Sequence, residues 1–240
     1  MSEFFLELFS EEIPPKLQTA AREKLYLDLN IFFETNNINS KGYKLLFSTP
    51  NRILIGFSNI SKSVVKKSQD IRGPSVTANP EALQGFLKSH NINKSQINLK
   101  KTEKGEFYFY CKPQQILKTY DLLKHNLPEI LDKINWNKSM KWGKNQMYWG
   151  RPLKSILAVF DKKKIEFSFH HLSSSNYTFL DKDFEEKIKN FNTIKAYQDY
   201  FKSKKIILDH KKRKEFITNE LNRISKKNNL ITDFKDNLLD

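Results

Sequence analysis

The segment 135–143 gathers the residue types that are best suited to contact a nucleic acid. It reads Asn-Trp-Asn-Lys-Ser-Met-Lys-Trp-Gly, and Trp-Gly-Arg-Pro follows at 149–152. Aromatic rings can stack on bases while Lys and Arg neutralise phosphates. Trp136, Trp142 and Trp149 are equally suited to a hydrophobic core between a helix and a strand. The residue types alone therefore leave both interpretations open.

No other group of residues predicts chemistry of its own. The seven glycines form neither Gly-x-x-x-x-Gly-Lys nor Gly-x-Gly-x-x-Gly, the patterns of phosphate-binding loops. His170 and His171 are adjacent and would point to opposite faces of a strand, so they do not suit one shared metal ion. Cys111 is expected to be an inert, half-buried thiol at a strand end. We therefore expect no catalytic residue and no metal site. The isolated histidines are expected at the surface or with satisfied partners: His90, His125 and His210.

Glu11 and Glu12 form the one pair of adjacent carboxylates that precedes an expected helix start. Two carboxylates could act as a general acid and a general base. Acidic residues ahead of a helix are also what the helix dipole favours. The dipole explanation needs no catalytic role, and we prefer it for this pair.

The charge of the chain favours a polyanionic partner. Lys and Arg number 42 against 27 Asp and Glu, which gives a formal charge of +15. Between residues 85 and 170 the count is 17 basic against seven acidic, or +10, whereas residues 181–240 carry 15 against 11, or +4. Such a concentration is typical of a binding face. The abundance of Lys, Asn, Ile and Phe also fits drift toward A/T-rich codons, so composition remains an alternative explanation.

Length and hydropathy indicate a globular protein of the cytoplasm. A chain of 240 residues can bury a substantial core, and a single cysteine excludes a disulfide framework. Mean hydropathy is −0.64, and no apolar run approaches the twenty residues of a membrane span. Acidic residues interrupt the amino-terminal apolar stretch, which is therefore not expected to be a signal peptide. We expect no contact with a membrane.

Local patterns predict the elements that must position these residues in the first half of the chain. Pro14 and Pro15 suit the first turn of a helix, because a missing N–H costs nothing there. Asn79 followed by Pro80 is typical of a helix start, and Gly105 suits a hairpin turn. The expected elements are strands at 3–9, 43–47 and 53–57, a helix from 15 that ends at 36–37, a helix at 82–89, and a hairpin of 97–101 with 107–111.

The second half predicts a more helical region. A helix is expected from about 115 to 134, interrupted or restarted at Pro128, and strands are expected at 153–160, 164–169 and 206–208. The order of elements favours an α+β fold in which antiparallel β hairpins pack with helices and the carboxyl-terminal region is helical. We expect a first region at 1–175 and the mostly helical start of a second at 176–240. The pattern ends without a closing element, so the chain is expected to be cut from a longer protein.

Five short segments together resemble the bacterial glycyl-tRNA synthetase β subunit. Phe-Ser-Glu-Glu-Ile-Pro-Pro at 9–15 resembles its Gly-Thr-Glu-Glu-Leu-Pro-Pro, and Thr-Pro-Asn-Arg-Ile at 49–53 its Thr-Pro-Arg-Arg-Leu. Arg-Gly-Pro at 72–74, Lys-Ser-Met-Lys-Trp-Gly at 138–143 and Arg-Pro at 151–152 follow in the order of the family. The resemblance runs to at least Leu157 and more faintly to Arg213. It departs at 176–179, where Asn-Tyr-Thr-Phe stands in place of Gly-His-Arg-Phe.

The resemblance implies a non-catalytic subunit of a class II aminoacyl-tRNA synthetase. In that family a separate α subunit binds ATP, with Mg, and glycine, and the β subunit recognises tRNA within a heterotetramer. The expected partners are therefore the α subunit and glycine tRNA, and this chain is expected to bind no cofactor. The HD-type and anticodon-binding domains of the β subunit are not among these 240 residues.

Six residues follow as candidate RNA contacts. Basic side chains would bind phosphates by releasing counterions, and Trp142 would stack on a base. Turn geometry is the alternative explanation for the Arg-Gly-Pro and Arg-Pro segments. The candidate phosphate contacts are Arg52, Arg72, Lys138, Lys141 and Arg151.

Two other interpretations of the chain remain open. The chain could be an interaction module that docks on the α subunit through Glu11, Glu12 and the first helix, with its lysines reflecting base composition only. It could also be a truncated gene product without activity. Equal, salt-sensitive binding to tRNA and to duplex DNA would indicate generic polycation behaviour and favour the first of these.

Overall fold

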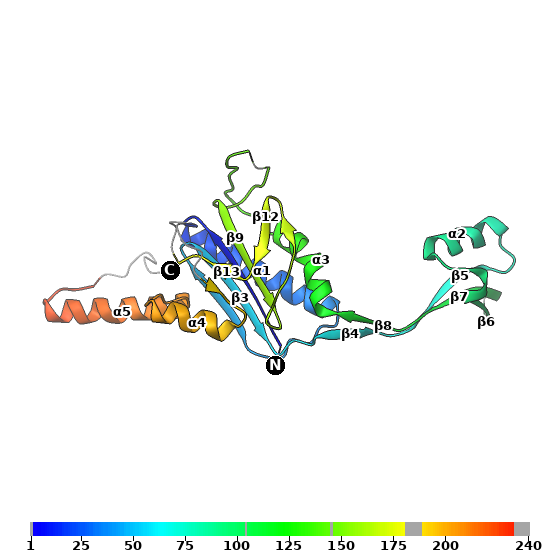
Figure 1. Ribbon diagram of the computed structural model, residues 1–240, viewed down its shortest axis with the longest axis horizontal. Helices are drawn as coiled ribbons and strands as arrows, with labels where there is room; N and C mark the ends of the chain where they lie inside the picture. Colours follow the sequence, from blue (N-terminus) through cyan, green and yellow to red (C-terminus); the bar gives the residue numbers. More distant parts are fainter. Residues whose placement is uncertain (1, 104, 145, 181–188, 233–240) are drawn as a thin grey trace. The chain divides into compact units, whose positions relative to one another are not determined.

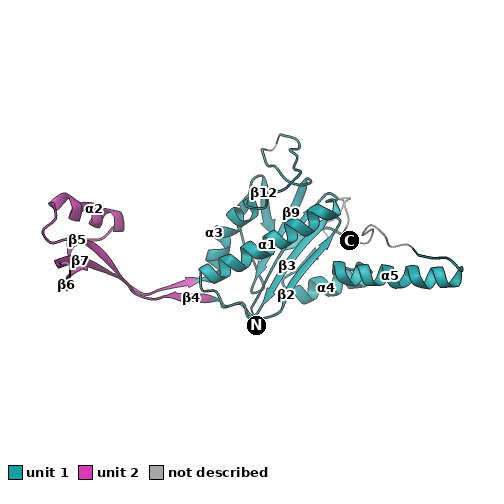
Figure 2. Cartoon of the chain, turned by 180° about the vertical axis from the view of Figure 1, so that it is seen from behind, with its two compact units in different colours: residues 1–62, 118–240 teal, residues 63–117 magenta. Residues whose placement is uncertain are grey.

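The computed structural model describes residues 2–103, 105–144, 146–180 and 189–232, and it confirms the α+β class (Figure 1). The chain divides into two compact units, residues 1–62 with 118–240 (unit 1) and residues 63–117 (unit 2) (Figure 2). Unit 2 is inserted in the sequence of unit 1, a division that the sequence did not suggest. The boundary expected at residue 175 stays a prediction.

Unit 1 is built around a central strand, β1 (Glu3–Ser10), that is covered on both sides. β1 pairs antiparallel with β3 (Arg52–Ser58) and with β9 (Leu153–Phe160), and β12 runs parallel to β9. The strand order is β11-β12-β9-β1-β3-β2, with β10 also paired to β9. The remaining strands of this sheet are β2 (Lys44–Thr49), β10 (Lys163–Lys164), β11 (Ser168–Phe169) and β12 (Leu172–Ser175).

Neighbouring phenylalanines of β1 face opposite layers of helices. The ring of Phe4 meets that of Phe33 edge-on at 6.2 Å, and Phe33 belongs to α1 (Pro15–Thr35). Phe5 packs at 6.1 Å from Tyr197 of α4 (Ile194–Ser203), on the other face. Burial on both faces explains why β1 reads as an almost continuous apolar run. The other elements of unit 1 are α3 (Thr119–Asp132), β13 (Tyr177–Thr178), β14 (Lys189–Asn190) and α5 (His210–Lys227).

The described part of unit 2 contains a three-stranded antiparallel sheet, the helix α2 (Pro80–His90) and a short two-stranded pair. The strand order is β5-β7-β6, and α2 begins as predicted, with the Asn79 side chain accepting a hydrogen bond from the Glu81 N–H. Gly105 starts β7 with φ of 113°, a conformation that favours glycine. The elements are β4 (Ser63–Lys66), β5 (Gln69–Ser75), a 3₁₀ turn at Lys94–Gln96, β6 (Ile97–Thr102), β7 (Gly105–Lys112) and β8 (Gln115–Lys118), which pairs with β4.

Four local predictions were wrong. Residues 115–118 form strand β8, because they pair with β4. The helix α3 continues through Pro128, since buried Leu123, Leu127 and Leu131 hold both sides of it against the core. Residues 206–208 form no strand.

The strand expected at 164–169 is also interrupted. Ser174 explains part of the interruption, because its hydroxyl donates to the Ile165 carbonyl and accepts from the Phe167 N–H. In the part of the chain that the structure describes, no helix is long and apolar enough to cross a membrane.

In unit 1, the side chain of Trp136 packs directly against the backbone of Gly150. A Cβ atom there would lie 2.2 Å from a ring carbon of Trp136. We expect Gly150→Ala to lower the free energy of unfolding by about 2 kcal/mol, because overpacking forces the ring to shift. Urea unfolding followed by tryptophan fluorescence measures the change.

Gly85→Ala is the matched control, since nothing lies within 4 Å of a Cβ atom at that position of α2. Alanine is the better helix former, so this variant should be neutral or more stable by up to about 1 kcal/mol. Equal effects of the two substitutions would contradict the packing at Gly150.

Candidate nucleic-acid interface

A buried carboxylate organises the interior of unit 1. Glu7 of β1 has an exposed fraction of 0%, and its Oε2 atom lies 3.4 Å from Nε of Arg52. Its carboxylate also accepts hydrogen bonds from the hydroxyls of Thr178 and Tyr197. An ionised carboxylate is stable in a protein interior only when it is paired and hydrogen-bonded in this way.

Arg52 belongs to this buried network, which corrects its interpretation as a phosphate contact. Its side chain is only 2% exposed, and Nη2 donates to the carbonyls of Phe179 and Leu180. The guanidinium also lies over the ring of Phe9, 4.6 Å from its centroid. Since the charge already has these partners, we no longer count Arg52 among the candidate contacts.

The electrostatics of the network favour a structural role. Burial raises the pKa of the Glu7 carboxyl above its usual value, although the charge of Arg52 and the two hydroxyl hydrogen bonds oppose that effect. Burial and then the charge of Glu7 raise the pKa of Tyr197 well above its usual value. Tyr197 therefore stays protonated and donates to the carboxylate. The site is closed to solvent, so it offers no place for a substrate.

Four of the remaining candidates lie on one connection of unit 1, residues 135–152, which we call the basic loop. Lys138 is exposed, and Nζ of Lys141 lies 2.9 Å from Oε1 of Gln146 and 4.5 Å from the ring centroid of Tyr148. Arg151 is half-buried, and Nη1 donates to the Gly150 carbonyl at 3.0 Å. The basic loop therefore presents cations beside an exposed aromatic ring.

Of the three tryptophans of the basic loop, two pack in the core and one stays a candidate for contact with a nucleic acid. Trp136 and Trp149 are 8% and 2% exposed, with ring centroids 5.0 Å apart, so the core interpretation is correct for both. Trp142 is half-buried and meets the His171 ring edge-on at 6.0 Å. Backbone hydrogen bonds between Met140 and Trp149, 2.8 and 3.2 Å long, tie the loop to this core.

Arg72 lies in unit 2 beside aromatic residues that sequence reasoning missed. Its guanidinium carbon is 3.6 Å from the ring centroid of Phe107. Cross-strand pairing places Arg72 opposite Phe109 and Lys100 opposite Phe107, and Nζ of Lys100 lies 5.5 Å from the Phe109 ring centroid. We call these four residues the aromatic–basic face. The signal was the alternation Phe-Tyr-Phe-Tyr at 107–110, whose odd positions share one face.

The histidine pair, the cysteine and the acidic pair that were considered as catalytic or metal-binding groups lie on different elements. Among the described residues, no three His, Cys, Asp or Glu side chains are placed to hold a metal ion. Cys111 is exposed, which corrects the half-buried position expected for it. His170 and His171 lie in the turn between β11 and β12 and not in a strand. The exposed Glu11 carboxylate lies 3.5 Å from Nζ of Lys154.

Comparison with known proteins gives one consistent result. Residues 4–240 match the family model described as glycyl-tRNA synthetase beta subunit. The glycine–tRNA ligase beta subunit of Rickettsia bellii is 34% identical over 230 residues, which cover 96% of this chain and 35% of that protein. The corresponding subunit of Rickettsia typhi is 35% identical over 233 residues, which cover 96% and 34%. The chain thus spans about a third of the length of these curated relatives.

The buried pair leads to a prediction about pH. In Arg52→Met the Glu7 carboxyl loses its cation, so we expect a loss of about 3–5 kcal/mol in unfolding free energy at neutral pH. Because the folded pKa of Glu7 lies above its usual value of 4.5, ionisation costs stability as the pH rises, and loss of Arg52 raises that pKa further. The difference from wild type should therefore shrink as the pH falls toward 4.5.

Urea unfolding at several pH values measures this difference. Glu7→Gln combined with Arg52→Met removes both charges, and it should be more stable at neutral pH than Arg52→Met alone. A loss in Arg52→Met that is the same at every pH, and that the double substitution does not reduce, would contradict the pairing.

Proposed function

The chain belongs to the glycyl-tRNA synthetase beta subunit family, and from this premise we propose that it forms part of the tRNA-binding surface of a heteromeric glycine–tRNA ligase. It would bind and orient glycine tRNA while a separate α subunit, with ATP and Mg, attaches glycine. The function supports protein biosynthesis, and we place it in the cytoplasm, where tRNA is charged.

The basic loop is the observation that carries this proposal. Lys138 and Lys141 are exposed, and Tyr148 presents an open aromatic ring at the Nζ atom of Lys141. Such a pair suits a nucleotide, since the ring can stack on a base while the ammonium group binds the adjoining phosphate. Half-buried Trp142 offers a second aromatic edge in the same loop. The anchored Trp136 and Trp149 limit the entropy that the loop would lose on binding.

The aromatic–basic face of unit 2 supports a second contact with RNA. Phe107 and Phe109 lie on one side of the sheet, with the charges of Arg72 and Lys100 beside their rings, and Lys100 is also paired with the Asp70 carboxylate. Unit 2 carries nine Lys and Arg against four Asp and Glu, a net charge of +5. A sheet that carries half-buried aromatic rings with basic side chains beside them is a surface on which unpaired bases can stack. Arg72 thus remains a candidate contact.

The sharpest test of this function is Lys138→Gln combined with Lys141→Gln. Loss of two phosphate contacts should weaken binding of glycine tRNA and reduce the slope of log affinity against log salt by about two. Filter binding of the purified chain across a salt series measures both quantities, with a non-cognate tRNA and duplex DNA as comparisons.

Lys226→Gln combined with Lys227→Gln is the matched control, because both lysines are exposed at the end of α5 and outside the basic loop. This control should bind tRNA with nearly the wild-type affinity. If both double variants lose the same affinity, binding follows total charge alone and the basic loop is not a site.

A second candidate function, docking on the α subunit, is favoured by the outer surface of α1. Leu27 and Ile31 are 53% and 50% exposed, and their spacing of four residues puts them side by side on one helix face. Exposed apolar side chains in such an arrangement are typical of a protein interface. Glu11 and Glu12, which lie just before α1, are exposed as well.

Leu27→Gln combined with Ile31→Gln tests the docking function. We expect this variant to lose binding to the α subunit by about tenfold or more, because two apolar side chains no longer leave water on association. Isothermal titration of the purified chain with the α subunit of the same organism measures it, and circular dichroism checks the fold. Unchanged α-subunit affinity excludes this face from the interface.

A further inference from the structure

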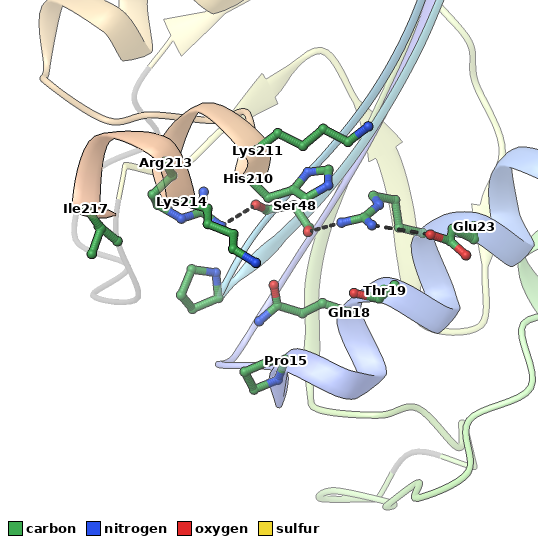
Figure 3. A pocket seen from close by; sticks show the side chains of 12 residues that line it. Pro15, Gln18, Thr19, Glu23, Ser48, His210, Lys211, Arg213, Lys214 and Ile217 are labelled. Atoms are coloured by element: carbon green, nitrogen blue, oxygen red, sulfur yellow. Dashed lines mark hydrogen bonds and ion pairs between the residues drawn. The ribbon is translucent and has the colours of Figure 1, made fainter. Parts of the chain in front are cut away.

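A basic pocket opens in unit 1 between α1, the end of β2 and the start of α5 (Figure 3). Its volume is about 600 Å³, which is large enough for a mononucleotide or a short stretch of nucleic-acid backbone. Figure 3 shows Arg213 and Lys214 of α5 across from Gln18 and Thr19 of α1. None of the candidate RNA contacts named above lines this pocket.

Cations dominate the lining of the pocket. Arg22, Lys211, Arg213 and Lys214 all contribute to it, whereas Glu23 supplies the one carboxylate among its lining residues. The lining therefore carries a formal charge of +3. In addition, Pro15, the first residue of α1, lines the pocket, and α1 begins without a capping side chain.

Arg22 is held in the pocket by one neutral and one acidic partner, and one of its donors has no partner among the described residues. Its side chain is 5% exposed, and Nη1 donates to the Ser48 hydroxyl at 2.8 Å. The Glu23 carboxylate lies 3.6 Å from Nη2, on the exposed side of the helix. Among the described residues, Nε of Arg22 has no hydrogen-bond partner although it is buried. A buried guanidinium with an unfilled donor is an unsatisfied position that an anion would complete.

Arg213 reaches the same point from the opposite side. Its Nη2 donates to the Ser48 carbonyl and its Nη1 to the Ile207 carbonyl, each at 2.9 Å. Both partners are neutral, and the two guanidinium groups converge on Ser48, with the Asp209 carboxylate near enough to favour the charged form of each. Burial and then the approach of Arg22 lower the pKa of His210, and burial lowers the pKa of Arg22 and of Arg213. The Asp209 carboxylate opposes each of these pKa shifts, so burial is the dominant cause of all three.

We propose that this pocket binds a phosphate group. A phosphate offers three or four oxygens and up to two negative charges, so it can accept from several donors that approach from different sides. A carboxylate has two coplanar oxygens and one charge, which a single guanidinium already satisfies. The phosphate belongs either to a free phosphate or mononucleotide or to an RNA backbone, and the chemistry of recognition is the same. This inference does not depend on RNA binding by the basic loop.

The first experiment measures the affinity of the purified chain for inorganic phosphate by isothermal titration at constant ionic strength. Lys211→Gln combined with Lys214→Gln should weaken phosphate binding by about tenfold or more, because charge-assisted hydrogen bonds are lost. Both lysines are exposed, so the fold should survive the change. Lys212→Gln combined with Lys226→Gln removes the same charge from α5 outside the pocket lining and should bind phosphate as wild type does.

A second variant examines the geometry of recognition and not only charge. Arg213→Lys keeps the positive charge but removes the planar fork, so phosphate affinity should fall although the net charge is unchanged. Acetate at the same ionic strength should bind far more weakly than phosphate. Binding of acetate as strong as that of phosphate, or phosphate affinity that is equal in all the variants, overturns the proposal.

A competition experiment against bound inorganic phosphate identifies the source of the phosphate group. A single-stranded RNA that displaces inorganic phosphate at much lower concentration than adenosine monophosphate indicates an RNA backbone, whereas equal displacement indicates a free phosphate or nucleotide. The variant with Lys138→Gln and Lys141→Gln should keep wild-type affinity for inorganic phosphate. Failure of the basic loop to bind tRNA and failure of this pocket to bind phosphate are thus seen in separate measurements.

Discussion

The ion pair of Glu7 and Arg52 is the interaction on which the core of unit 1 depends. It joins the two neighbouring strands β1 and β3, and the same carboxylate receives the hydroxyls of Thr178 and Tyr197 from β13 and α4. The four residues lie far apart in the sequence and come from four elements. Because a buried charge is costly without its partners, every element that supplies one must be in place for the core to be stable. The network thus couples the helix α4 to the first strand.

The same constraint separates buried from exposed positive charge. Arg52 is buried in the core, where it donates to backbone carbonyls and lies over aromatic rings, so it stabilises the fold. Lys138 and Lys141 lie on a loop whose ends are anchored by the paired rings of Trp136 and Trp149, so their charges remain outside. Arg22 is intermediate, since it is buried at the edge of a pocket and keeps a donor unfilled. The three environments assign different roles to the same kind of residue.

Family membership and geometry complement each other in this chain. The comparisons place the chain in the glycyl-tRNA synthetase beta subunit family, and the described residues contain a basic loop, an aromatic–basic face and a basic pocket. Codon drift would account for the number of lysines, but it would not explain why two arginines converge on Ser48 or why Arg72 lies over Phe107. Such placements need specific tertiary contacts, so these positions say more about the roles of the basic residues than their number does.

The amino-acid sequence by itself determined those features of the fold that depend on residues close together in the chain. The strand at 3–10, the helix that starts at Pro15, the hairpin of β2 and β3, the Asn79 cap and the turn at Gly105 follow from apolar periodicity and from backbone preferences within a few residues. Family motifs, read in order, identified the family in the same local way.

Only the tertiary structure decided which charges are buried. Arg52 and Lys138 both stand in family-like motifs, yet one is in the core and the other is exposed, because the partners of Arg52 lie at positions 7, 179 and 180. The separate unit of residues 63–117, the strand at 115–118 and the pocket formed by Arg22 with Arg213 likewise depend on segments distant in the chain. Local preferences carry no information about such partners, since burial and pairing are properties of the assembled core.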